Sequence, residues 1–308
     1  MCGIVGLFLK DRSLEKELGC FLSDMLVTMT DRGPDSAGIA IYGQEKAGFT
    51  KVTIQSDTPD ITFGDFERRL GDLLGKSSAL RLKDSHAVAD VPSDRVADVR
   101  AMIDNLQGAV RVMSVGETME IYKEVGLPKD VVSRFGIPAM SGTHGIGHTR
   151  MATESAVTTL GAHPFSTGAD QCLVHNGSLS NHNNLRRELK QLGMRFETQN
   201  DSEVAAAYLT ARIREGMDLG EALTSALDDL DGFFTFVVGT KTGFGVLRDP
   251  IACKPAVMAE TDQYVAFGSE FRALVGLPNI DNARVWEPEP SSVYFWDRET
   301  NAAQTLAA

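Results

Sequence analysis

The first nine residues, Met1–Leu9, read MCGIVGLFL. This segment is short, apolar and broken by two glycines, a composition that predicts a buried β-strand. No basic residues precede it and the charged run Lys10, Asp11, Arg12 follows, so it lacks the features of a secretory signal peptide. The chain therefore starts with a core strand that carries a cysteine at its second position.

Removal of the initiator methionine would give Cys2 a free α-amino group beside its thiol. Such an amine titrates near about 7.7–8.0 and a free thiol near about 8.5. One residue would then supply both a nucleophile and a base, which is a known way to activate a weak nucleophile. Taken alone, Cys2 is better explained as a small buried hydrophobic residue.

Apolar spacing predicts blocks of helices and strands after the first strand. Ser13 is predicted to cap a helix with a continuous apolar stripe up to Met29. Strands are predicted at Ser36–Gly43 and Phe49–Ile54, and further blocks follow Gly142. The charged stretch from about residue 56 to 140 is predicted to be an insertion with its own small fold. Strands and helices in separate blocks indicate an α+β fold.

Two polar segments flank predicted strands. RGPDSAG begins at Arg32 and can be a simple turn between a helix and a strand. GHTRMAT places Arg150 at the end of an apolar, glycine-rich strand, where a planar guanidinium suits a carboxylate ligand. An arginine at a strand end is also often an ordinary surface residue without a function. Neither segment therefore decides the function alone.

Two further polar segments carry amide and carboxylate groups. HNG contains Asn176 and Gly177, a pair typical of hairpin turns but also able to form an oxyanion hole. NDSE precedes an alanine-rich helix, which Asp201 or Ser202 can simply cap. The carboxylate of Asp201 is equally suited to hold a substrate ammonium group.

Taken in order, CGIVG, RGPDSAG, GHTRMAT, HNG and NDSE resemble the class II glutamine amidotransferases. That family includes amidophosphoribosyltransferase, hexosamine-phosphate synthase, asparagine synthetase and glutamate synthase. Later segments, RDP at Arg248 and GSE at Gly268, are also similar to the family's. The matching pieces cover Met1–Gly43 and Gly142 to about Leu274.

The resemblance implies a four-layer αββα sandwich, the fold of the N-terminal nucleophile hydrolases. One amidotransferase domain would then span residues 1–308, interrupted by the insertion at about 56–140. Cys2 is expected at the end of a central strand.

The resemblance also implies roles for individual residues. The Cys2 thiol would attack the side-chain amide of glutamine, and its α-amine would carry the proton to the leaving ammonia. Asn176 and the Gly177 N–H would stabilise the oxyanion. Arg150 would bind the α-carboxylate of glutamine and Asp201 its α-ammonium.

Three further site residues are weaker expectations from the same resemblance. Arg32 is expected to order the turn beside the nucleophile, and Thr153 and His163 to make secondary substrate contacts. One departure concerns the RDP loop, in which Ala252 replaces a glycine common in the family. That replacement affects the conformation of the loop rather than the chemistry.

Composition excludes several other classes of function. The net charge of −12 argues against nucleic-acid binding, which depends on lysine and arginine. No apolar stretch is long enough for a membrane span, and the four cysteines lack a paired spacing, so a cytoplasmic protein with reduced thiols is expected. His144 and His148 have the spacing of a helical metal motif, but in a strand they lie about 13 Å apart, so no metal site is expected.

Two other functions stay open. Acylases with N-terminal nucleophiles also begin with Met-Cys, but they lack the pairing of Arg150 with Asp201. A non-catalytic amidotransferase-fold subunit for assembly or regulation would be marked by loss of Cys2, Arg150, Asn176 or Asp201. All four residues are present.

The ammonia acceptor is expected on another polypeptide. The chain has no Walker loop and no dinucleotide fingerprint, and about forty residues follow Glu270. The segments GHTRMATESAVTTLGAHPFS and YKEVGLPKDVVSRFGI are similar to stand-alone amidotransferase subunits related to glutamate synthase, including that of N-methylglutamate synthase. Glutamine is thus the expected substrate and a glutamate synthase-like subunit the expected partner. No cofactor is expected in this chain; FMN, if used, would belong to that partner.

Overall fold

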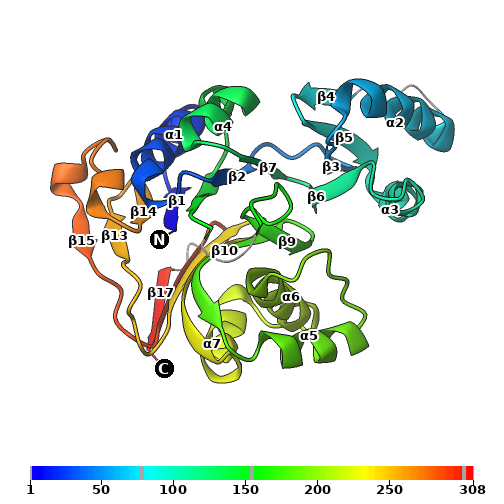
Figure 1. Cartoon of the computed structure of the whole chain (residues 1–308). Helices are drawn as coiled ribbons and strands as arrows, with labels where there is room; N and C mark the ends of the chain where they lie inside the picture. Colours follow the sequence, from blue (N-terminus) through cyan, green and yellow to red (C-terminus); the bar gives the residue numbers. More distant parts are fainter. Residues whose placement is uncertain (1, 76–79, 153–155, 300–302, 308) are drawn as a thin grey trace.

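The computed structural model describes residues 2–75, 80–152, 156–299 and 303–307 (Figure 1). Two large sheets lie face to face, with helices on their outer faces. The first sheet has the strand order β15-β13-β14-β1-β8-β2-β7. Its strands are β1 Gly3–Leu9, β2 Ser36–Tyr42, β7 Met119–Val125, β8 His144–Arg150, β13 Val257–Glu260, β14 Tyr264–Gly268 and β15 Arg284–Trp286.

The second sheet has the order β17-β16-β12-β11-β10-β9. Its strands are β9 Phe165–Gly168, β10 Gln171–Leu179, β11 Gly232–Gly239, β12 Gly243–Arg248, β16 Ser292–Asp297 and β17 Ala303–Ala307. The helices α1 Leu18–Thr28 and α4 Pro128–Phe135 cover the first sheet. The second sheet is covered by α5 His182–Gln191, α6 Asp201–Arg214 and α7 Leu219–Asp229. The predicted four-layer αββα arrangement is confirmed.

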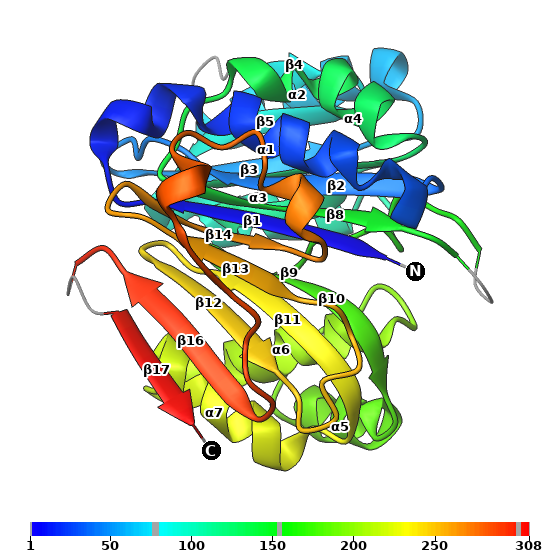
Figure 2. The same cartoon turned by 90° about the vertical axis from the view of Figure 1, so that its left-hand side faces the viewer.

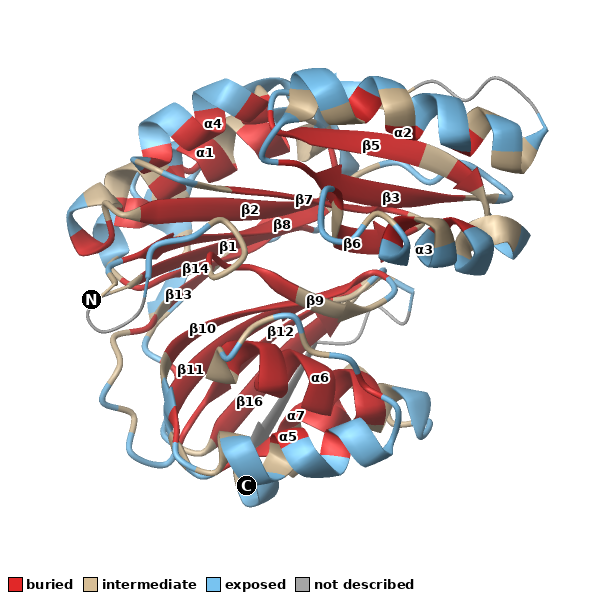
Figure 3. Ribbon diagram, turned by 45° about the vertical axis from the view of Figure 1, so that its right-hand side comes forward, coloured by how far each residue is buried: buried red, intermediate tan, exposed pale blue. Residues whose placement is uncertain are grey.

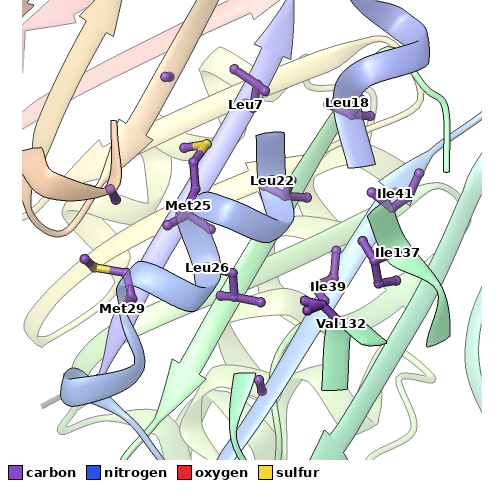
Figure 4. Close-up of a cluster of buried hydrophobic side chains, with 14 of the residues drawn as sticks. Leu7, Leu18, Leu22, Met25, Leu26, Met29, Ile39, Ile41, Val132 and Ile137 are labelled. Atoms are coloured by element: carbon purple, nitrogen blue, oxygen red, sulfur yellow. The ribbon is translucent and has the colours of Figure 1, made fainter. Parts of the chain in front are cut away.

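Strand β1 shows how the sequence builds these layers. Every residue of β1 is buried, because helices cover one face of its sheet and the second sheet covers the other. Val5 and Leu7 belong to the apolar cluster that also contains Leu22 and Leu26 of α1. Figure 4 shows Leu7 beside this helix. Ile4 and Phe8 point the other way, into the core between the sheets. Even-numbered positions of β1 therefore face the second sheet.

The helix after β1 begins later than predicted. Asp11, not Ser13, provides the cap: its carboxylate accepts a hydrogen bond from the Ser13 N–H at 2.8 Å and starts a 3-10 helix, Arg12–Glu17. The α-helix proper starts at Leu18. Both residues are good capping types, so the apolar pattern alone could not distinguish them.

A four-stranded unit, Phe49–Gly116, packs beside the β7 edge of the first sheet (Figure 1). Its sheet has the order β4-β5-β3-β6 and its own apolar core. The elements are β3 Phe49–Gln55, α2 Pro59–Leu74, β4 Leu80–Lys83, β5 His86–Pro92, α3 Val96–Asp104 and β6 Arg111–Gly116.

The bounds of this unit differ from the predicted insertion at about 56–140. β3 belongs to the four-stranded sheet, whereas β7 pairs with β2 and α4 packs on the first sheet. The prediction followed charge content, which reports exposure and not strand pairing.

A buried aspartate ties the four-stranded unit to the second sheet. Asp170, in the turn between β9 and β10, accepts hydrogen bonds from the backbone N–H groups of Glu117, Thr118 and Met119 at 2.7–2.9 Å. Its carboxylate occupies the space that a side chain at Gly116 would need. The turn after β6 is thereby fixed against the second sheet.

The loop after β12 contains the alanine that replaces the family's glycine. Arg248 donates to the Ala252 carbonyl at 2.9 Å, and Asp249 accepts from the Ala252 N–H at 3.2 Å. Ala252 has φ of 51°, in the left-handed region that glycine adopts without steric cost. The sequence change therefore leaves a strained residue in an ordered loop.

We expect Ala252→Gly to stabilise the protein by about 0.5–1 kcal/mol. Removing the steric strain of a left-handed alanine lowers the free energy of the folded state. This gain exceeds the cost of ordering glycine, whose backbone has more conformational entropy in the unfolded state. Denaturant unfolding of the two proteins measures the difference. A lower stability of the glycine variant would contradict this account.

Candidate active site

Cys2 lies at the N-terminal end of β1, next to the C-terminal end of β8 (Figure 2). In the antiparallel register Gly3 pairs with Thr149 and Ile4 with His148, so Cys2 is adjacent to Arg150. The alternation seen for Ile4 places the Cys2 side chain on the face toward the second sheet. The predicted position at the end of a central strand is therefore found.

The backbone carbonyl of Cys2 is held from two sides. Asn176 Nδ2 donates to it at 3.3 Å and Arg32 Nε donates at 3.0 Å. The Arg32 guanidinium also donates to Glu270 Oε1 at 2.6 Å. This hydrogen bond is the largest cause that lowers the pKa of the Glu270 carboxyl. The CGIVG, RGPDSAG and HNG segments thus meet at Cys2. Glu270, for which no role was predicted, holds the Arg32 guanidinium in place.

The start of β1 is fixed by a second residue of the GSE segment. Ser269 Oγ accepts from the Ile4 N–H at 2.9 Å, and the Ser269 N–H donates to the Ile4 carbonyl at 2.9 Å. Ser269 was not predicted as a site residue. Its motif was recognised, but only pairing across the sheet shows what the hydroxyl does.

Gly177 continues β10 and does not form a hairpin turn. Its register partner is Phe234 in β11, and its φ is +149°. A Cβ at this position would lie 1.9 Å from the Phe233 carbonyl oxygen and 2.9 Å from His175 Nε2. A glycine is required here by both the backbone and the close approach of β11.

The RGPDSAG turn packs directly on the end of β8. The Asp35 N–H donates to the Arg150 carbonyl at 3.1 Å, and the Asp35 carboxylate accepts from the Ala152 N–H at 2.8 Å. A side chain at Gly33 would lie 2.5 Å from the Arg150 backbone. Arg150 itself is buried, with 8% of its surface exposed. Thr153 lies outside the described residues.

Asp201 is the first residue of α6, and Asn200 is the residue that caps the helix. Asn200 Oδ1 accepts from the Ser202 N–H at 2.9 Å, which leaves the Asp201 carboxylate available for other contacts. Asp201 Oδ2 accepts from the Leu179 N–H at 2.9 Å. Asp201 is therefore attached to the end of β10, the strand that also carries Asn176.

Three buried histidines, His148, His163 and His175, form a cluster near Asp201. The rings of His148 and His163 stack with centroids 4.0 Å apart. Ser202 Oγ is hydrogen-bonded to His163 Nε2 at 2.8 Å and to His175 Nδ1 at 2.9 Å, and it lies 3.4 Å from Asp201 Oδ1. His163 was predicted as a secondary substrate contact. Its ring contacts Ser202, which in turn lies next to Asp201. Its predicted contact with substrate stays a prediction.

Burial keeps these imidazoles uncharged. Desolvation is the main cause that lowers the pKa of His148 to about 3 and of His175 to about 4, and it lowers the pKa of His163 well below 6.5. A neutral cluster next to Asp201 leaves the negative charge of that carboxylate available for a cation.

We expect the free energy of unfolding to fall as the pH drops from about 6.5 toward 4. In this window the unfolded chain protonates these histidines near 6.5, whereas the folded protein keeps them neutral. Because the unfolded state binds more protons, each histidine contributes up to about 1.4 kcal/mol per pH unit to the slope. Urea unfolding midpoints measured at several pH values test this. A midpoint that stays constant or rises on acidification to pH 5 would contradict it.

The remaining cysteines differ from Cys2 in their surroundings. Within the described residues, Cys2, Cys20, Cys172 and Cys253 are all free thiols. Burial raises the pKa of Cys172 to about 12, which makes this thiol a poor nucleophile. Cys253 is exposed.

Neither a metal site nor a membrane span is present in the described part of the chain. No group of three or more His, Cys, Asp or Glu side chains there is arranged to hold a metal ion. None of the described helices combines the length and apolar character needed to cross a bilayer.

The chain is similar to known proteins in both sequence and fold. A family model described as a glutamine amidotransferase domain matches residues 148–276. The chain is 70% identical to the glutamine amidotransferase-like protein GlxB of Rhizobium meliloti (strain 1021), over 98% of this chain and 100% of the relative. It is 30% identical to the amidophosphoribosyltransferase of Methanocaldococcus jannaschii over 61% of this chain and 40% of that protein.

A solved structure agrees with the layer arrangement. The glutamine phosphoribosylpyrophosphate amidotransferase of B. subtilis superimposes with a TM-score of 0.63 at 19% identity, covering 99% of this chain and 49% of that one. The chain thus spans about half the length of that enzyme. With the motifs, the fold and a full-length relative in agreement, this chain belongs to the class II glutamine amidotransferases.

Proposed function

We propose that this chain hydrolyses glutamine with Cys2 as nucleophile and supplies the ammonia to a separate synthase polypeptide. The main observation behind the proposal is that both Asn176 and Arg32 donate hydrogen bonds to the Cys2 carbonyl oxygen. These contacts fix the nucleophile's backbone beside an amide donor. An activated nucleophile needs this kind of positioning.

The proposed chemistry takes two steps at the Cys2 sulfur. The thiol gives its proton to the α-amine and attacks the amide carbon, forming a tetrahedral oxyanion. Collapse breaks the C–N bond, and the amine returns the proton to the departing ammonia. Water then hydrolyses the γ-glutamyl thioester to glutamate and restores the thiol.

Arg150 and Asp201 are proposed to select an α-amino acid over a simple amide. Arg150 lies beside Cys2, and Asp201 is attached to the strand of Asn176. Their opposite charges match the carboxylate and the ammonium of glutamine. An acylase acting on a simple amide would not need this pair, because its substrate lacks the α-carboxylate and the α-ammonium.

We expect Arg150→Ala and Asp201→Asn each to raise the glutamine KM by about tenfold or more. Each change leaves one charge of the substrate without its partner, which costs about 1.5–3 kcal/mol. Steady-state ammonia release over a range of glutamine concentrations measures the effect. Arg187→Gln, at an exposed position of α5, is a matched control that should leave KM unchanged. Unchanged KM in both site variants would contradict the assignment.

A glutamine-mimicking diazo-keto norleucine tests the nucleophile directly. Cys2 is expected to carry the label, while Cys20, Cys172 and Cys253 stay unmodified. Peptide mapping reads the position. Labelling mainly at another cysteine, or no labelling of active protein, would reject Cys2 as nucleophile.

The acceptor is proposed to be a glutamate synthase-like or N-methylglutamate synthase subunit. Two observations support a separate partner: GlxB is matched along its full length, whereas the amidophosphoribosyltransferase is matched over 40% of its length. The segments at 147–166 and 122–137 support this subgroup by their similarity to its members. FMN would belong to the partner. The surfaces proposed for the partner are the predicted insertion at about 56–140 and the segment after Glu270.

Co-purification from the native cell tests the partner. A flavin-containing, glutamate synthase-like polypeptide is expected to accompany the chain, and adding it with its substrate should raise glutaminase turnover. Full turnover by a chain that purifies alone would indicate a free-standing glutaminase. A bound partner with no glutaminase activity in either state would instead favour a non-catalytic assembly subunit.

A further inference from the structure

A cavity of about 610 Å³ lies between the four-stranded unit and the catalytic layers. Its walls are α3 and β6 on one side and β9, the loop around Arg195 and α6 on the other; Figure 3 shows these elements facing each other. Cys2, Arg32, Arg150, Asn176 and Asp201 do not line it. Ligand sites commonly have about 300–1,000 Å³ and form between structural units. The cavity is therefore a second candidate site, separate from the catalytic one.

Two charged groups of the wall are already engaged in three hydrogen bonds each. Glu203 accepts from the Glu197 N–H, the Thr198 N–H and the Thr198 hydroxyl at 2.6–2.8 Å. Lys123 donates to three backbone carbonyls, those of Leu160, Ala162 and Pro164, at 2.8–3.3 Å. A lysine ammonium has three donors, so Lys123 has none left for a ligand. These groups hold the wall together.

Three other charged groups of the wall have unused hydrogen-bonding capacity. Among the described residues, Arg100 has no hydrogen bond or ion pair, and the Arg214 guanidinium contacts Met194 Sδ but no carboxylate. The Glu197 carboxylate has no hydrogen-bond donor among the described residues. Burial and the neighbouring Glu203 raise its pKa more than the positive charges of Lys123 and Arg100 lower it. Two guanidinium groups and one carboxylate thus line the same cavity with hydrogen-bonding capacity that the described residues do not use.

We propose that this cavity binds an acidic α-amino acid. Its two carboxylates would pair with Arg100 and Arg214, and its ammonium with Glu197. The apolar surfaces of Leu160 and Phe165 in the same wall would contact the carbon chain. A dicarboxylate without an amine would leave Glu197 unpaired, and a neutral amino acid would leave one arginine unpaired.

The site lies between two units that the hydrogen bonds of Asp170 to the turn after β6 already join. Asp104 of α3 and Arg195 of the opposite wall form an exposed ion pair at 2.8 Å. Exposed pairs contribute little on their own. A ligand that contacts Arg100 on one side and Glu197 and Arg214 on the other would therefore strengthen this interface. L-Glutamate is also the product of the proposed reaction; regulation by product would rest on that proposal, but binding does not.

Calorimetric titration with L-glutamate tests the site in the full chain. Arg150→Ala is used as background, because it removes the proposed carboxylate ligand of the catalytic site. This protein is expected to bind one L-glutamate, and a further Arg100→Gln change should weaken binding at least about tenfold. Arg187→Gln in the same background is the control and should leave binding unchanged. Arg100 is exposed, so Arg100→Gln should fold, and a melting curve verifies it.

The outcomes separate this site from the catalytic proposal. No saturable L-glutamate binding in Arg150→Ala, or binding that Arg100→Gln leaves unchanged, overturns the cavity site. Glutarate that binds as tightly as L-glutamate overturns the assignment to an amino acid. If binding depends on Arg100 while the glutamine KM is insensitive to Arg150→Ala, the cavity site is supported and the substrate-binding role of Arg150 is contradicted.

Discussion

Replacement of Cys2 by alanine is expected to lower kcat for glutamine hydrolysis at least about 10⁴-fold, because the proposed thioester cannot form without the Cys2 sulfur. Ammonia release in a coupled assay measures the effect. The Cys2 backbone contacts with Asn176 and Arg32 involve its carbonyl oxygen, so they survive the substitution and the variant should fold. Cys253→Ala, at an exposed position, is the matched control and should keep its activity.

The same mechanism requires that Met1 be absent from the active protein. With Met1 attached, the Cys2 nitrogen is an amide and cannot carry the proton. Intact-mass measurement of active protein should show the loss of one methionine. Cys2→Ala protein that hydrolyses glutamine within tenfold of the unmodified rate, or active protein that retains Met1, would contradict the proposed nucleophile.

The parts of the fold with strong local patterns could be predicted from the sequence. β1 follows from its apolar run, and the order of the polar motifs led to the four-layer arrangement. The helix start at Leu18 and the cap at Asn200 could not be predicted, because neighbouring residues of similar type compete for the same backbone N–H groups. Of the four-stranded unit, β3 was predicted, whereas β4, β5 and β6 were not, since the charge content of the stretch does not show which strands pair.

The candidate site shows the same division between local and long-range information. Cys2, Arg150, Asn176 and Asp201 were found because their motifs are contiguous in sequence. The role of Gly177 as a strand residue depends on the Phe233 carbonyl in β11, which no local pattern contains. The contacts of Ser202 with His163 and His175 join residues 39 and 27 positions apart. Such contacts exist only after α6 packs against β10.

Among the described residues, the Asn176 amide nitrogen donates one hydrogen bond. Its Nδ2 donates to the Cys2 carbonyl at 3.3 Å, and an amide nitrogen has two hydrogens. The second hydrogen is proposed to meet the oxyanion that forms when the Cys2 sulfur attacks. This contact strengthens as negative charge develops, so it acts on the transition state more than on bound glutamine.

We therefore expect Asn176→Ala to lower kcat by about 10²–10³-fold with a much smaller change in KM, since the Gly177 N–H stays as a second donor. Steady-state kinetics with glutamine gives both parameters, and a melting curve confirms that the variant is folded. Asn183→Ala, at an exposed position of α5, is the control and should match the unmodified protein. A raised KM with an unchanged kcat would place Asn176 in ground-state binding and leave the oxyanion without a side-chain donor. The contrast with Arg150→Ala and Asp201→Asn, which should act mainly on KM, makes the three assignments separable in one set of measurements.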